Sequence, residues 1–258
     1  MSSQRWCKPI VLAGVLAVTS LTMTQAQQTR PGLMSSAGLF ATMPGVVAQQ
    51  VQALGARIQR PGKEHSAFTG QFVDATGNRS VVITYQVPGL VRVLGLGGQA
   101  VSFDGEQVYG SSTRTTDTVL ETFVMDLPEG MFTSLRNGEA MRFLGRGFRP
   151  DARVAPKYSG PRYDIYEVTA LLRARTDRLL RLKRYYFDSK TGLLVSTRYE
   201  DRTVSPAVRV QTQFSDWFTL DGSSYPGRVD RYENGRPVFT LVIGSVTAGP
   251  RQDATSFR

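Results

Sequence analysis

Alternation of apolar and polar residues dominates the chain from about residue 66 onward. Within 80–87, Val81, Ile83, Tyr85 and Val87 occupy every second position and would share one face of a strand. Other segments with this alternating pattern are separated by Gly, Asn, Asp and Pro, the residues typical of turns. The pattern predicts antiparallel strands over 68–73, 80–87, 91–96, 107–109, 163–172, 179–188, 193–201, 208–219, 224–233 and 237–246.

Turn signals fit this series of strands. Asn234-Gly235 is the clearest, because both residues tolerate the positive φ angles of a type I′ hairpin turn. Further turns are expected at 74–78, at Asp104-Gly105, at 189–192 and at Asp221-Gly222. The sequence therefore favours a meandering antiparallel sheet.

Helical periodicity is confined to two places. Val47, Val51, Leu54 and Ile58 form one apolar stripe, which predicts a helix over 44–60. In the middle of the chain, apolar residues at helical spacing predict two short helices over 117–127 and 130–135, separated by 128–130. A Pro/Gly-rich basic loop is expected from 146 to 160.

The first residues have the three parts of a secretory signal peptide. Arg5 and Lys8 form a basic start, 10–23 is a short apolar core, and Ala26 closes a small-residue cleavage site. The apolar core is shorter than the roughly 20 residues that span a membrane, although an uncleaved N-terminal anchor is the alternative. We expect a signal peptide over 1–26, a flexible leader over 27–43, one domain over 44–248 and a flexible tail over 249–258.

Composition limits the chemistry of the exported chain. Cys7, the only cysteine, leaves with the signal peptide, so disulfides, thiolate metal ligands and a cysteine nucleophile are excluded. The formal net charge of +10 falls to +8 when Arg5 and Lys8 are removed. This basic excess favours contact with acidic surfaces and carries no information on the fold. Export to the periplasm or the medium is the expected destination.

No catalytic or cofactor-binding constellation emerges from the residues. His65 is the only histidine, and it lacks the spaced partners of a metal site. No serine lies in a Gly-x-Ser-x-Gly elbow, and the 95–98 glycines lack the full nucleotide-binding pattern. The pairs Asp164/Glu167 and Asp216/Asp221 are simpler as surface or turn residues than as glycosidase carboxylates. We therefore expect no catalytic residue, no metal and no cofactor.

A basic cluster covers the connection between the predicted strands 163–172 and 179–188 and the first part of the second strand. It is either the solvated face of a hairpin or a docking patch for an acidic envelope protein or an anionic membrane surface. Nucleic acid is not expected as a partner, because the export signal separates the chain from it and no recognition motif is present. The cluster consists of Arg173, Arg175, Arg178, Arg181, Lys183 and Arg184.

Three short sequence motifs resemble the LolA-like periplasmic lipoprotein carriers and their outer-membrane lipoprotein-sorting relatives. The first runs from Tyr85 through Pro88-Gly89 to Arg92 and on to Asp104-Gly105. The second combines 163–168 with 184–194, and the third combines 214–217 with 221–226. Together they span most of residues 45–246. In one respect the chain departs from the classical carrier, because Val87 stands before Pro88 where that carrier has an arginine that helps to lock its lid.

This resemblance implies a mainly β fold with minor α: a curved antiparallel sheet, or incomplete β-barrel, with an N-terminal helix and two short lid helices. The space between sheet and lid would hold a lipid or the acyl chains of a lipoprotein, and an apolar cavity does accept hydrocarbon. The same side chains could instead form a filled core. The expected lining residues are Val81, Ile83, Tyr85, Val91, Val93, Val119, Leu120, Phe123, Val124, Met131 and Phe132.

The function expected from these observations is that of an exported, non-enzymatic binding protein, acting as a monomer. A protein-interaction or envelope-stress-sensing domain on the same fold is a second interpretation. An exported hydrolase of unrecognised type is a third.

Overall fold

The structure is a computed structural model, and it describes residues 64–87, 89–97, 100–111, 113–128, 131, 141–147, 162–172, 179–202 and 206–258. These residues belong to one compact unit, Met34–Arg258. The predicted signal peptide, leader and helix over 44–60 lie outside the described residues. No helix among the described residues is long and apolar enough to cross a membrane.

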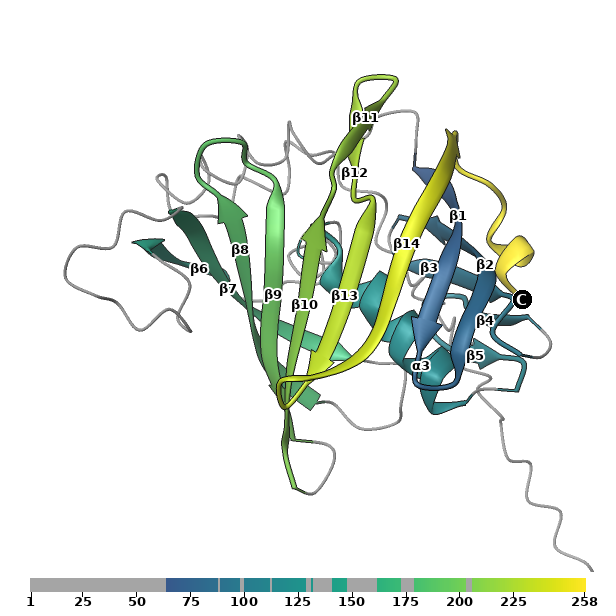
Figure 1. The fold of residues 1–258 in the computed structure, drawn as a ribbon, viewed down its shortest axis with the longest axis horizontal. Helices are drawn as coiled ribbons and strands as arrows, with labels where there is room; N and C mark the ends of the chain where they lie inside the picture. Colours follow the sequence, from purple (N-terminus) through teal and green to yellow (C-terminus); the bar gives the residue numbers. More distant parts are fainter. Residues whose placement is uncertain are drawn as a thin grey trace, which may run out of the picture. The chain divides into compact units, whose positions relative to one another are not determined.

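Antiparallel strands make up most of the described chain (Figure 1). The first five are β1 (His65–Asp74), β2 (Gly77–Gln86), β3 (Leu90–Leu94), β4 (Val101–Phe103) and β5 (Val108–Tyr109). Those in the middle of the chain are β6 (Met141–Gly147), β7 (Tyr163–Leu172), β8 (Leu179–Asp188) and β9 (Leu194–Asp201). The last are β10 (Val208–Ser215), β11 (Phe218–Leu220), β12 (Ser223–Tyr225), β13 (Arg228–Glu233) and β14 (Arg236–Gly249).

Twelve of the strands form one sheet in the order β5-β4-β3-β2-β1-β14-β13-β10-β9-β8-β7-β6, and β11 with β12 forms a separate hairpin. The first strand and the last strand pair with each other in the middle of this order. From that pair, β2 to β5 extend toward one edge and β13 to β6 toward the other. The sheet is not closed into a barrel, and the predicted mainly β, half-barrel architecture is confirmed.

The strand order explains why a helical segment crosses the sheet. Strands β5 and β6 are consecutive in the sequence, yet they lie at opposite edges of the twelve-stranded sheet. The chain between them must therefore pass over one face of the sheet. This connection contains α3 (Arg114–Glu121) and the π-helical turn η1 (Thr122–Asp126), which lie behind the strands in the view of Figure 1.

Helix α3 begins at a capping box. The side chain of Thr113 accepts a hydrogen bond from the backbone N–H of Thr116, and the Thr116 hydroxyl accepts one from the backbone N–H of Thr113. Such reciprocal bonds satisfy N–H groups that the first helical turn leaves unpaired. The hydroxyls of Thr118 and Thr122 donate to the carbonyls four residues earlier, so they can be buried without losing hydrogen bonds.

One face of the sheet, called the inner face here, packs against α3 and η1 and carries the hydrophobic core. Alternation assigns side chains to it: Val81, Ile83 and Tyr85 on β2 are at most 2% exposed, whereas Val82 and Thr84 between them are only partly buried. The core continues through Phe68 and Phe72 on β1 and through Phe239 and Leu241 on β14.

The hairpin between β13 and β14 confirms the predicted Asn234-Gly235 turn. Both residues have positive φ, 50° for Asn234 and 77° for Gly235. Asp221 and Gly222, at the β11–β12 turn, also have positive φ. In each turn the second residue is glycine, which adopts this backbone conformation without steric cost.

The expected helices and strands differ from the structure in several places. The first lid helix starts at Arg114, three residues before the predicted 117, because the capping box fixes its start. The predicted strand 208–219 is divided into β10 and β11, and 224–233 into β12 and β13. Strands β4 and β6 were not predicted; β6 also occupies the start of the loop expected from 146. The second predicted helix, 130–135, lies largely outside the described residues.

The segment 249–258, for which the sequence predicts a flexible tail, contains local structure and contacts with the sheet. A 3₁₀ turn over Ala254–Phe257 (η2) buries the Phe257 ring, which is 1% exposed. Gln86 and Gln252 exchange two hydrogen bonds, of 2.7 and 3.0 Å, and Arg258 pairs with Asp104 at 3.2 Å. Burial of one aromatic ring and these polar contacts hold the end of the chain against β2 and the β4–β5 turn.

Candidate functional site between the helical segment and the sheet

The candidate site is the contact between α3–η1 and the inner face of the sheet. One part of this contact, the apolar region, is formed by α3 and the first turn of η1 against β2, β3 and β4. The structure brings most of the predicted lining residues together there, all at most 4% exposed, apart from the partly buried Val124 at its margin. The buried members are Val81, Ile83, Tyr85, Val91, Val93, Val119, Leu120, Phe123 and Met131.

Aromatic rings join the apolar region to the centre of the sheet. The ring of Phe123 meets that of Phe68 edge-on at a centroid distance of 5.6 Å, and Phe68 meets Tyr225 at 6.0 Å. These are favourable edge-to-face arrangements. Phe132, the remaining predicted lining residue, lies outside the described residues. The described side chains of the apolar region are closely packed, an arrangement that also fits the alternative interpretation of a filled core.

The second part of the contact is polar and was not predicted. Asp126, the last residue of η1, and Lys183 on β8 form an ion pair in which both side chains are fully buried. The other carboxylate oxygen of Asp126 accepts a 2.5 Å hydrogen bond from the hydroxyl of Thr212 on β10. A charge removed from water is costly unless it is paired and hydrogen-bonded, and the Asp126 carboxylate meets both conditions.

Arg231 on β13 extends this cluster toward α3. Its guanidinium contacts Glu121 at 3.0 Å and Glu233 at 3.4 Å, and it lies 3.6 Å from Asp126. It also donates a 3.1 Å hydrogen bond to the hydroxyl of Thr122. We call Asp126, Lys183, Thr212, Arg231 and Glu121 the polar seam. The seam ties the helical segment to three strands, β8, β10 and β13.

Two tyrosines complete the surroundings of the seam. The hydroxyl of Tyr185 donates a 2.8 Å hydrogen bond to the backbone carbonyl of Met125. The ammonium group of Lys183 lies 4.5 Å from the centre of the Tyr199 ring, a cation–π distance. The carbonyl of Met125 thus has a partner from the sheet at the end of the π turn, where a helix leaves its last carbonyls unpaired.

Burial and charge act in opposite directions on the two buried bases. Burial lowers the pKa of Lys183, and the facing carboxylate of Asp126 offsets only part of this effect. For Arg231, burial also disfavours the charged form, but Tyr199 and the carboxylates of Glu121, Asp126 and Glu233 outweigh it and raise the pKa. Arg231 is therefore the fixed positive charge of the polar seam, consistent with the very high intrinsic pKa of guanidinium.

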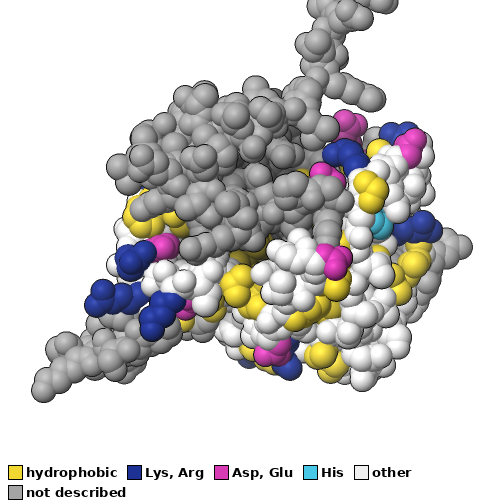
Figure 2. All heavy atoms as spheres, turned by 90° about the horizontal axis from the view of Figure 1, so that it is seen from above, with side chains coloured by type: hydrophobic (Ala, Val, Ile, Leu, Met, Phe, Trp, Pro, Cys, Tyr) yellow, Lys and Arg dark blue, Asp and Glu magenta, His cyan; other side chains and the backbone are white. Residues whose placement is uncertain are grey.

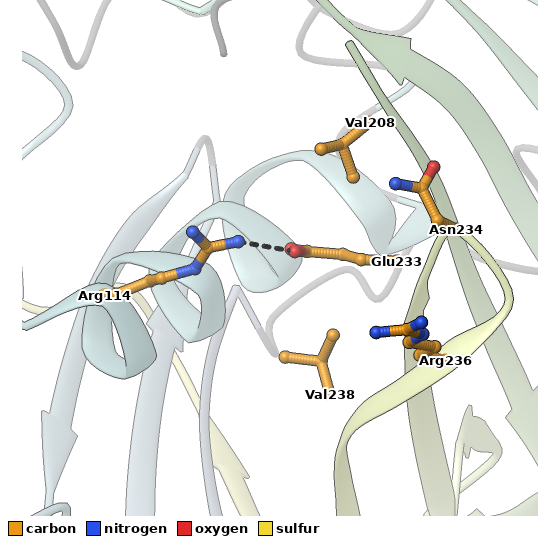
Figure 3. A pocket seen from close by; sticks show the side chains of 6 residues that line it. All are labelled: Arg114, Val208, Glu233, Asn234, Arg236 and Val238. Carbon is orange, nitrogen blue, oxygen red and sulfur yellow. Dashed lines mark hydrogen bonds and ion pairs between the residues drawn. The ribbon is translucent and has the colours of Figure 1, made fainter. Parts of the chain in front are cut away.

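A pocket of about 510 Å³ opens where the start of α3 meets the ends of β10, β13 and β14 (Figure 3). Arg114, at the start of α3, pairs across it with Glu233 at 2.8 Å. Glu233 also contacts Arg231, so this pocket adjoins the polar seam. We call it the rim pocket, and its lining residues are Arg114, Val208, Glu233, Asn234, Arg236 and Val238.

The structure changes the account of the predicted basic patch. Lys183 was assigned to this surface, but its side chain is fully buried, so that assignment is wrong: position 183 lies on the inner face, where Asp126 compensates its charge. Arg184 is exposed, and it pairs at 2.9 Å with Glu167, which also binds Arg142 at 2.5 Å. Arg173, Arg175 and Arg178 lie outside the described residues, as does the side chain of Arg181. Figure 2 shows charged side chains of both signs among hydrophobic ones on the face it displays.

The remaining polar candidates have structural surroundings. His65 begins β1, and its partial burial lowers its pKa. Asp164 pairs with Arg146 at 2.8 Å on neighbouring strands, and Asp216 and Asp221 have the positive φ of turn residues. No group of three or more potential metal ligands occurs within the described part of the chain.

A signal for the polar seam was present in the sequence. On β8, alternation puts Lys183 on the same face as Tyr185 and Phe187, and on β13 it puts Arg231 on the same face as Val229. A charged residue in phase with core residues indicates a buried charge that requires a partner. The partner itself, Asp126, could not be assigned without knowing where the connection crosses the sheet.

The fold agrees with solved structures of low sequence identity. LolA superfamily protein NE2245 from Nitrosomonas europaea is 11% identical; the match covers 81% of this chain and 96% of that protein, with a TM-score of 0.55. A putative outer membrane lipoprotein-sorting protein domain from Vibrio parahaemolyticus is 10% identical, with 81% and 95% covered and a TM-score of 0.52. No protein-family model and no curated protein sequence matches the chain. The likeness is thus one of architecture, and the chain has a LolA-like fold.

Proposed function

We propose that the protein is an exported, non-enzymatic carrier that holds the acyl chain of a lipid or lipoprotein between the inner face of its sheet and the segment α3–η1. The observation that carries the proposal is the convergence of apolar side chains from β2, β3 and α3–η1 beneath a connection that crosses an open sheet. The similarity to a LolA superfamily protein and to a lipoprotein-sorting domain supports the proposal at the level of fold alone.

The two parts of the contact would have different roles in binding. Between its ion-paired ends, Arg114 and Glu121, α3 meets the apolar region through nondirectional contacts. Hydrocarbon can replace these contacts with little change in free energy, since burial of apolar surface is retained. At the polar seam each charged group needs its own partner, and separating η1 from the sheet would leave charges inside the protein without their partners. An acyl chain would therefore enter beneath α3, while η1 stays attached to β8, β10 and β13.

Native mass spectrometry of the protein purified from its own cell envelope tests this proposal. The expected result is a bound species with the mass of a lipid, which organic extraction removes. Binding of added dodecyl phosphate to the delipidated protein, measured by titration calorimetry, provides the comparison between variants.

A matched pair of variants localises the binding. Ile83→Phe adds volume to the inner face, where Ile83 is fully buried, whereas Val82→Phe adds it to the opposite face of the same strand. The first should weaken dodecyl phosphate binding and the second should leave it unchanged, with thermal unfolding showing that both are folded. Equal affinity of the two variants, or failure of the wild-type protein to carry or bind any amphiphile, would refute the proposal.

A further inference from the structure

The rim pocket combines charge and apolar surface in a way that the acyl-chain site does not use. Arg114 and Arg236 supply two guanidinium groups, and Val208 and Val238 supply apolar walls. The side chain of Arg114 is 79% exposed, and Arg236 is also exposed, so both groups are accessible from solvent. The pocket is therefore open to a ligand from outside.

The carboxylate of Glu233 does not neutralise the pocket. One of its oxygens accepts from Arg114 at 2.8 Å, and the other faces the buried Arg231 at 3.4 Å. A single negative charge is thus shared between two guanidinium groups. The guanidinium group of Arg236 forms no hydrogen bond or ion pair with any residue that the structure describes, which leaves its donors available. The balance of charge in the pocket is positive.

Asn234 adds a neutral donor to this site. Its side-chain oxygen accepts a 2.9 Å hydrogen bond from the backbone N–H of Arg209, and this bond determines which end of the carboxamide is oxygen. The nitrogen end is turned toward the pocket, as Figure 3 shows. Guanidinium groups and an amide N–H₂ are the donors that carboxylate and phosphate oxygens accept.

The position of the rim pocket relates this donor set to the inner face. Glu233 and Val208 are on the inner faces of β13 and β10, in phase with Arg231 and Val210. Arg114 is the first residue of the helix that covers that face. A molecule with its tail beneath α3 and its head at the first turn of that helix would reach both sites.

We propose that the rim pocket binds the oxyanion headgroup, a phosphate or a carboxylate, of the amphiphile whose chain the protein carries. The two arginines and Asn234 would bind the oxyanion, and Val208 and Val238 would pack on the first carbons of the tail. The inference rests on the proposed carrier function and adds to it a preference for anionic over neutral amphiphiles.

Titration calorimetry with three probes tests the inference: dodecyl phosphate, dodecyl maltoside and inorganic phosphate. For the wild-type protein, dodecyl phosphate should bind more tightly than dodecyl maltoside. Arg236→Ala should weaken dodecyl phosphate binding about tenfold, the effect of losing a charge-assisted contact, and Arg236→Glu should weaken it further. Neither substitution should alter the affinity for dodecyl maltoside.

Arg209→Ala is the matched control. This substitution removes the same charge as Arg236→Ala. Arg209 is exposed on β10, but its side chain lies on the face opposite Val208 and Val210. This variant should bind dodecyl phosphate like the wild-type protein. An equal loss in Arg209→Ala and Arg236→Ala would overturn the inference in favour of a general charge effect.

The outcomes separate this inference from the carrier proposal. If both amphiphiles bind and Arg236→Ala changes neither affinity, the carrier function stands and the headgroup site is refuted. If inorganic phosphate binds in an Arg236-dependent manner while neither amphiphile binds, the pocket is a site for free anions, and both proposals fail as stated.

Discussion

The two parts of the contact between α3–η1 and the sheet use opposite physical chemistry. In the apolar region, side chains such as Ile83, Val91 and Val119 are buried by nondirectional packing. In the polar seam, Asp126 is paired with Lys183 and hydrogen-bonded to Thr212 with a defined geometry. The first kind of contact tolerates replacement of one apolar partner by another. The second does not, because a buried charge without its partner is strongly destabilising.

This difference suggests that the two ends of the connection between β5 and β6, α3 and η1, have different roles. Topology forces the chain between β5 and β6 to cross the sheet, and the seam fixes where its π-helical end lies. The adjoining α3 is ion-paired at its two ends, Arg114 and Glu121, and between them it makes the type of contact that a hydrocarbon chain can also make. A ligand that entered beneath α3, as proposed, would leave the position of η1 on the sheet unchanged.

The largest expected effect comes from breaking the polar seam. Asp126→Ala leaves Lys183 buried without its carboxylate partner and should lower the free energy of unfolding by about 3–5 kcal/mol. Urea denaturation of the purified variant measures this change. The double variant Asp126→Leu/Lys183→Met removes both charges together and should recover most of the loss. A double variant as unstable as Asp126→Ala would contradict the role of the ion pair.

A cavity in the apolar region should be costly but repairable. Ile83→Ala should lower the free energy of unfolding by about 2–5 kcal/mol, since it removes buried methyl groups and leaves space behind. Benzene should raise the thermal midpoint of this variant more than that of the wild-type protein, because a dry apolar cavity binds such molecules. It should give no such selective rescue of Asp126→Ala. Equal responses of the two variants would remove the distinction between the regions.

The start of α3 offers a smaller test. Thr113→Ala removes the side chain that caps the helix and should cost about 1 kcal/mol in urea denaturation. Thr115→Ala, inside the same helix, should be close to neutral, as alanine favours helices. Because α3 covers the apolar region, Thr113→Ala should also bind dodecyl phosphate with altered affinity, whereas Thr115→Ala should not. A capping loss without any change in binding would dissociate α3 from the ligand site.

The smallest effect is expected outside both regions. Although burial alone would raise the pKa of Glu167, its hydrogen bonds and charge interactions with Arg184 and Arg142 lower it below the ordinary value. A carboxyl group of this kind stabilises the fold above its ordinary pKa, and the contribution disappears as the pH falls through the lowered value. Glu167→Gln should therefore be less stable than the wild-type protein at neutral pH, and the difference should vanish once the pH has fallen below the lowered pKa of Glu167. Unfolding midpoints across this pH range measure the difference, and a gap that persists in acid would contradict the assignment.

Much of the fold could be predicted because alternation and turn chemistry are local. The strands β7 and β8 were expected with the bounds they have, and Asn234-Gly235 forms the expected turn. The contacts of the C-terminal segment could not be predicted, because its partners, Gln86 and Asp104, are distant in the sequence and no local pattern reveals them. Lys183 was misassigned for the same reason. A cluster of basic residues in a sequence indicates a surface, unless a carboxylate that pairs with one of them, here Asp126, is known.

The central claim is that an acyl chain enters the apolar region while the polar seam stays closed. Hydrogen–deuterium exchange of the delipidated protein, with and without saturating dodecyl phosphate, tests it most directly. The account predicts that ligand changes the exchange of amides in β2, β3 and α3, and leaves those of Asp126 and Tyr185 as protected as before. Unchanged exchange in β2, β3 and α3 at demonstrated saturation, or loss of protection at Asp126 and Tyr185, would contradict it.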